Sequence, residues 1–191
     1  MRYTTILILT FIFFKPQYFY AQSPKNNRLI ENKNTIIFWS VGKKLAWSDF
    51  NKIKKDTNLI SLAKSYTEIK MFPYLPSDSN SYLYKVFACF HRDKSYTNSL
   101  SKYLLMHEQL HFDITELFAR KLRMKIKKKV IKSSYIDYSL IYEENNKAYR
   151  QYQKRYDEET LHSVNIEKQK QWYTIIASEL EKLKEYSIDI N

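Results

Sequence analysis

This 191-residue sequence contains one cysteine, one glycine and four prolines. The single cysteine, Cys89, excludes an intramolecular disulfide bond. The single glycine, Gly42, excludes the phosphate-binding and dinucleotide-binding loops that need several glycines, and no G-x-S-x-G motif is present. The sequence therefore gives no support to nucleotide-binding enzymes or to serine hydrolases of that type.

The chain also lacks an early hydrophobic run that is long enough to cross a bilayer, which needs about 20 residues. Its first apolar run, Ile6–Phe14, follows a short basic start and precedes the small residue Ala21. This pattern is typical of a signal peptide, although a buried hydrophobic helix is the alternative. We expect a signal peptide at 1–22, a polar leader at 23–34 and a single domain at 35–187. The protein is then exported (periplasmic, cell-surface or extracellular), with no stable membrane insertion after signal removal.

Acidic residues are fewer than basic ones, 20 against 32, so the formal net charge is +12. Such an excess suits anionic partners. Since an exported protein seldom meets nucleic acid, we expect no nucleic-acid partner and retain anionic envelope polymers as candidates. The densest basic run is Lys125–Lys132. Cations complement the carbonyl end of a helix, so we interpret this run as a solvated helix end in preference to a binding patch.

The pattern of residues changes near position 98, from β-rich segments to segments with helical spacing of apolar residues. The expected strands are 35–40, 63–72 and 81–90, and the expected helices are 99–132, 136–158 and 166–186. Strands followed by helices indicate an α+β fold. We expect a small antiparallel sheet of about three strands packed on the first helix, with two further long helices. Cys89 should be a buried strand thiol, and Gly42 should mark a turn.

The first expected helix carries the motif His107-Glu108-Gln109-Leu110-His111. Residues four apart share one helix face, so both histidines can bind one Zn²⁺. Glu108 would lie beside the metal and act as general base on a zinc-bound water. About 0.005 such motifs are expected by chance in a chain of this length and composition, which makes the match specific. The alternative is that the histidines only pack or face water.

Catalytic zinc usually takes three protein ligands, so a third must come from another segment. His162, between the second and third expected helices, is the leading candidate. Asp157 is the next, either as a ligand or as the carboxylate that orients a ligating imidazole. His91, expected in a polar loop, is a weaker candidate. Tyr156 is a candidate catalytic residue that donates its hydroxyl to a developing oxyanion, although it could equally be a packing residue.

Three segments of the chain resemble a bacterial family of predicted secreted zinc-dependent proteases of unknown function. The strongest is His107–Leu122, which contains the HExxH motif. Leu45–Phe50 resembles a Trp-x-Asp-Phe segment of the family, and Tyr156–His162 resembles its Tyr-Asp-x-x-Thr-x-His segment. The family usually has a glycine next, where this chain has Ser163. The resemblance spans most of the expected domain.

The resemblance implies a zincin-like fold, a Zn²⁺ cofactor and a peptide or protein substrate, with Asp157 and His162 as site residues. Together with the motif, it predicts a secreted zinc-dependent metallohydrolase, most simply a peptidase, in which Glu108 is the general base. The alternative is an envelope or surface binding protein without catalytic activity, either zinc-stabilised or metal-free. A zinc-stabilised protein would have a closed site with four protein ligands, whereas a hydrolase keeps one position open.

Overall fold

The computed structural model describes residues 35–52, 63–77, 83–132 and 136–188. All of these lie in one compact unit, Asn32–Asn191. The expected signal peptide and polar leader lie outside the described residues. The described part is an α+β structure with two three-stranded sheets and three long helices, so the α+β class of the prediction is confirmed.

The larger sheet is antiparallel and has the strand order β1-β5-β4. Its strands are β1 (Ile36–Phe38), β4 (Thr67–Tyr74) and β5 (Leu83–His91). Alternate residues of β5, Val86, Ala88 and Phe90, are almost fully buried. This alternation follows the two-residue period of a strand, and it gives the sheet the apolar face on which a helix packs.

A second, smaller sheet was not predicted. It consists of β2 (Asn51–Lys52), β6 (Tyr96–Thr97) and β3 (Ala63–Lys64), in the order β2-β6-β3. The β2 and β6 strands run parallel, and β3 and β6 run antiparallel. Strands β2 and β6 are too short to show a hydrophobic period, so they were not predicted from the sequence. Strand β3 lies at the start of the predicted strand 63–72, which the structure divides into β3 and β4.

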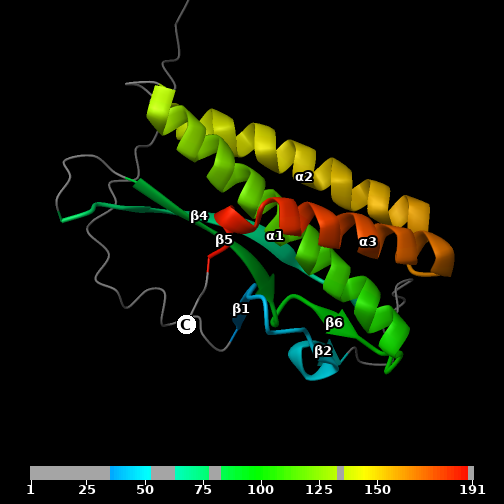
Figure 1. The fold of residues 1–191 in the computed structure, drawn as a ribbon. Helices are drawn as coiled ribbons and strands as arrows, with labels where there is room; N and C mark the ends of the chain where they lie inside the picture. Colours follow the sequence, from blue (N-terminus) through cyan, green and yellow to red (C-terminus); the bar gives the residue numbers. More distant parts are fainter. Residues whose placement is uncertain (1–34, 53–62, 78–82, 133–135, 189–191) are drawn as a thin grey trace, which may run out of the picture. The chain divides into compact units, whose positions relative to one another are not determined.

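The helical layer consists of α1 (Lys102–Lys132), α2 (Tyr138–Thr160) and α3 (Ile166–Lys182), followed by a short 3-10 turn, η3 (Lys184–Tyr186). Helix α1 contacts β3, β4 and β5 as well as α2 and α3. Figure 1 shows this arrangement, with α1 running along the sheet and α2 and α3 beside it. The three predicted helices are confirmed within a few residues at each end.

Side-chain caps explain where α2 and α3 begin. The Asp137 carboxylate accepts a hydrogen bond from the Leu140 amide, and the Asn165 side chain accepts one from Lys168. Each cap satisfies an amide that has no partner within its helix. The lysine run forms the end of α1, where residues 127–130 are exposed, as predicted for a helix end.

A buried ionic cluster ties α1 to the last described residues. Glu116 pairs with Arg120 and Arg123, and all its oxygen–nitrogen distances to them lie between 2.9 and 3.2 Å. The Arg120 guanidinium also donates to the Leu180 carbonyl, and that of Arg123 donates to the Tyr186 carbonyl, each at 2.7 Å. Because Glu116 and Arg120 are buried, these bonds offset the loss of hydration of the charged groups.

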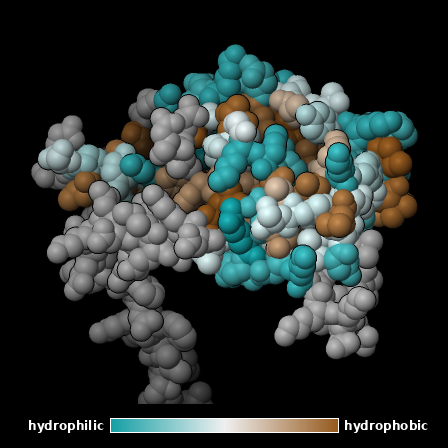
Figure 2. All heavy atoms as spheres, turned by 90° about the horizontal axis from the view of Figure 1, so that it is seen from below, coloured by the Kyte–Doolittle hydropathy of each residue, from teal (hydrophilic) through white to brown (hydrophobic). Residues whose placement is uncertain are grey.

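The single glycine and the single cysteine both lie in described segments of the fold. Gly42 lies in a turn bracketed by a bridge between Ser40 and Lys43, as predicted. Cys89 is fully buried on β5, and burial raises the pKa of its thiol to about 12. No described helix has the length and apolar character of a membrane span. Figure 2 shows one face, on which hydrophilic and apolar residues are interspersed.

Candidate metal centre

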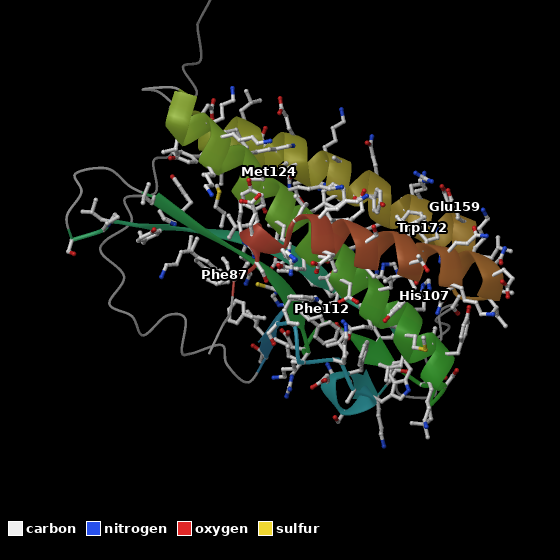
Figure 3. The ribbon with its side chains drawn as sticks, viewed as in Figure 1. Phe87, His107, Phe112, Met124, Glu159 and Trp172 are labelled. Atoms are coloured by element: carbon white, nitrogen blue, oxygen red, sulfur yellow. The ribbon has the colours of Figure 1, made fainter. Side chains whose placement is uncertain are left out.

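Helix α1 places the two motif histidines one turn apart, as the spacing predicts. Their ring centroids are 4.8 Å apart, and their Nε2 atoms are 3.2 Å apart. His107 is buried and His111 is half-buried. Figure 3 shows His107 on the part of α1 that lies near the first turns of α3. Two imidazole nitrogens this close to each other could share one cation.

Asp157 of α2 completes a triangle of potential ligand atoms. Its Oδ1 atom lies 3.0 Å from His111 Nε2 and 3.4 Å from His107 Nε2. Among the described residues, these three form the one group of histidine, cysteine and acidic side chains that could hold a metal ion. Ligand atoms on a tetrahedral zinc at about 2.0–2.1 Å lie about 3.3 Å apart, so the triangle has the size that zinc requires.

Two imidazole nitrogens and one carboxylate oxygen are donors that suit zinc. They would fill three of its four coordination positions and leave the fourth open. The same set of two histidines and one carboxylate also serves non-haem Fe²⁺ enzymes. A zinc hydrolase also needs a carboxylate that lies near the ligand triangle but outside it and acts as a base. The presence of this carboxylate distinguishes a zinc hydrolase from the Fe²⁺ enzymes.

Glu108 is such a carboxylate. It is buried, and its Oε2 atom accepts a hydrogen bond from the Ser65 amide at 2.7 Å. Ser65 lies between β3 and β4, so the segment joining the two sheets holds the carboxylate in place. The charge of Glu108 acts to raise the pKa of both motif histidines, although the net shift for His107 is downward. Glu108 is not part of the ligand group.

The three groups of the cluster shift one another's pKa values. Burial alone would raise the pKa of Asp157, but hydrogen bonds from His107 and His111 hold it well below its usual range. Burial lowers the pKa of His111, yet Asp157 and Glu108 more than offset this and raise it to about 8. For His107, burial prevails and lowers the pKa. The hydrogen bonds from the two histidines therefore favour an ionised Asp157.

Tyr156 is fully buried and stacks on His107 with a centroid distance of 4.6 Å. Its hydroxyl lies 2.8 Å from His107 Nδ1 and donates to the His107 carbonyl oxygen at 3.3 Å. Trp172 also packs edge-on against Tyr156 with a centroid distance of 5.4 Å, and its indole N–H donates to Glu159 at 2.9 Å. In this geometry the hydroxyl contacts the histidine, whereas the sequence had suggested an oxyanion of a substrate.

His162 lies near the ligand triangle but does not belong to it. Its side chain is 80% exposed, and its Nδ1 atom is 3.7 Å from Asp157 Oδ1. The described ligand group contains Asp157 and leaves His162 out. Helix α2 ends just before His162, so the helical register points Asp157 at α1 while His162 belongs to the turn that follows.

His91, the weaker candidate, belongs to a different part of the fold. It is the last residue of β5 and is buried, so the expectation of a polar loop was wrong. Its Nε2 atom bonds the Glu68 carboxylate, and its ring packs edge-on against Tyr66. It is not in the ligand group.

Two glutamines that the sequence did not single out contact the histidines. Gln153 Oε1 is 2.6 Å from His111 Nδ1, and Gln169 Oε1 is 3.2 Å from His107 Nδ1. Gln153 lies four residues before Asp157 on α2, so the helical period could have placed it on the same face. Gln169 comes from α3, and the sequence holds no signal for it.

The turn after α2 contains three consecutive residues with positive φ: Leu161 at 50°, His162 at 50° and Ser163 at 80°. This left-handed region costs a residue other than glycine about 1–2 kcal/mol. The strain lies directly beside the candidate centre, since the His162 amide donates to the Asp157 carbonyl oxygen at 2.9 Å.

Replacing Ser163 with glycine should therefore stabilise the protein. We expect S163G to raise the free energy of unfolding by about 0.5–1 kcal/mol, because glycine adopts φ near 80° without steric cost. Urea denaturation would measure the change. As a control, S178G introduces glycine inside α3, where it should destabilise by a few tenths of a kcal/mol or more. A loss of stability in S163G would contradict the strain at this position.

Comparison with known proteins gave no match. A scan against protein-family models, a search of curated proteins and a search of solved structures each found nothing similar to the chain. The interpretation of the site therefore rests on its own geometry.

Proposed function

We propose that this protein is a zinc-dependent hydrolase, most simply a peptidase, with a zincin-like arrangement in which the HExxH helix lies against an antiparallel sheet. The observation that carries the proposal is the size of the ligand triangle. His107, His111 and Asp157 present three atoms 3.0–3.4 Å apart, and Glu108 lies beside them. Export of the chain and membership of the secreted protease family are parts of the same proposal.

In such a site His107, His111 and Asp157 would hold Zn²⁺, which would supply Lewis-acid polarisation of the attacking water and of the carbonyl of the scissile bond. Glu108 accepts a proton from the attacking water as the new carbon–oxygen bond forms, and it delivers that proton to the leaving nitrogen as the carbon–nitrogen bond breaks. The hydrogen bond from the Ser65 amide fixes the Glu108 carboxylate for this transfer.

Two features favour hydrolysis over the alternatives. A purely structural zinc site would be closed by a fourth protein ligand, and the described residues supply three. An oxygen-activating Fe²⁺ site has no need for a carboxylate base outside the ligand set, and Glu108 occupies that position. The net charge of the chain alone, which had suggested a surface binding protein, does not account for the convergence of these four side chains.

Removal and return of the metal tests the proposal. The purified protein should contain about one zinc per chain and should cleave a mixture of peptides from a digested proteome, with products identified by mass spectrometry. Treatment with a chelator should abolish cleavage, and zinc should restore it. Stoichiometric iron, or cleavage that survives complete metal removal, would overturn the proposal.

A further inference from the structure

The two glutamines beside the histidines have their amide groups oriented by the backbone. Gln153 Nε2 donates to the His111 carbonyl oxygen at 2.9 Å, and Gln169 Nε2 donates to the Tyr103 carbonyl oxygen at 3.3 Å. A carbonyl oxygen only accepts, so each glutamine must present its nitrogen to the backbone. Its Oε1 atom is then left to face the imidazole.

This orientation decides which ring nitrogen carries the proton. An amide oxygen only accepts, so Nδ1 of His111, 2.6 Å from Gln153, must be the donor. The same holds for Nδ1 of His107, which faces Gln169 and also the Tyr156 hydroxyl. Tyr156 donates its own proton to the His107 carbonyl oxygen, so its oxygen is free to accept from Nδ1. In a neutral ring, the lone pair then lies on Nε2, which points into the ligand triangle.

We propose that Gln153 and Gln169 are positioning residues, which hold both histidines in the tautomer and ring orientation that present Nε2 to the metal. This inference rests on the proposed zinc site. The two histidines do not depend on the glutamines equally. His107 has a second acceptor in Tyr156, whereas Gln153 is the one hydrogen-bond partner of His111 Nδ1 among the described residues.

The side-chain amides of Gln153 and Gln169 are uncharged, and this affects the net charge around the candidate metal centre. Acceptors of this kind are often carboxylates, which make the imidazole a stronger ligand and add negative charge. Here Asp157 is the one charged member of the ligand set, and the acceptors behind the histidines are uncharged. The positive charge of a divalent cation at this centre would therefore be less neutralised by its surroundings. More of that charge would be available to polarise a substrate.

Zinc affinity, measured by competition with a chromophoric chelator, tests the assignment without reference to activity. Gln153→Met keeps the length of the side chain and removes the acceptor, and it should weaken zinc binding by about 10–100-fold. Gln169→Met should have a smaller effect because Tyr156 remains. Gln151→Met and Gln171→Met make the same change on exposed positions of α2 and α3, and they should bind zinc like the wild type.

A rescue variant and a spectroscopic measurement complete the test. Gln153→Glu restores an acceptor and should bind zinc at least about tenfold more tightly than Gln153→Met. Nitrogen-15 histidine spectra of the zinc-loaded wild type should show both rings bound through Nε2 and protonated at Nδ1. Coordination through Nδ1, or equal affinity of Gln153→Met and Gln151→Met, would overturn the inference.

The outcomes separate this inference from the proposed function. If the glutamine variants behave as expected but no peptide is cleaved, the hydrolase proposal fails and the positioning role stands. If zinc and cleavage are present and Gln153→Met is indistinguishable from its control, the positioning role alone fails. If the wild type takes up no zinc, both fail.

Discussion

Substitution of Glu108 with glutamine should lower the rate of peptide cleavage by about 10²–10⁴-fold, which is the contribution expected of a general base. Glutamine keeps an oxygen that can accept the hydrogen bond from the Ser65 amide, so the local structure should be retained. The variant loses only the basicity. Because Glu108 lies outside the ligand group, the zinc content should remain at the wild-type level.

The measurement pairs initial rates on the identified peptides with metal analysis of the same samples. Glu158→Gln is a suitable control, because it removes an exposed carboxylate of α2 that pairs only with Lys154 at the surface. Its rate should equal that of the wild type. Cleavage by Glu108→Gln within a few-fold of the wild-type rate would assign the base to another group.

Replacement of Asp157 with alanine should remove most of the bound metal. Loss of an acceptor behind a ligand already costs about 10–100-fold in affinity, so loss of a ligand itself should exceed about 100-fold. His162→Ala should retain zinc, because its ring is exposed and lies outside the ligand triangle. This pair of variants compares directly the two candidates that the sequence offered for the third position.

Metal analysis after dialysis against a weak chelator would measure both variants. Glu158→Ala, a neighbour of Asp157 on the exposed side of α2, controls for the loss of a carboxylate from this helix. Thermal denaturation of the metal-free forms would confirm that each variant folds. Retention of zinc by Asp157→Ala together with its loss in His162→Ala would reverse the assignment and make the exposed imidazole a ligand.

Much of the fold could be predicted because its long elements carry clear periods. The 31 residues of α1 hold apolar residues at helical spacing with no proline or glycine, and β5 alternates between buried and less buried positions over part of its length. The two-residue strands β2 and β6 could not be predicted, because contacts between distant segments create them. The division of the predicted strand 63–72 into β3 and β4 could not be predicted either.

The site was predictable to the extent that it follows the helical period. His107 and His111 are one turn apart on any α-helix, so their proximity was expected. The third zinc ligand was harder to assign from the sequence. Imidazole is the better zinc ligand in general, which favoured His162, but the end of α2 leaves that residue in the turn and directs Asp157 inward. The contact between Ser65 and Glu108 depends on how the sheets meet α1, for which one sequence has no signal.

The ionic cluster around Glu116 lies on α1, the helix that carries the histidines of the candidate metal centre. Its contacts depend on residues that are synthesised much later than α1. Arg120 and Arg123 lie on the same helix as His107, and two of their acceptors are carbonyl groups more than 50 residues later, at Leu180 and Tyr186. Until those residues have been synthesised, the two guanidinium groups have Glu116 as a partner but lack these two hydrogen bonds, which help to offset their loss of hydration. The helix that bears the two histidines therefore completes these contacts only after Leu180 and Tyr186 have been added to the chain.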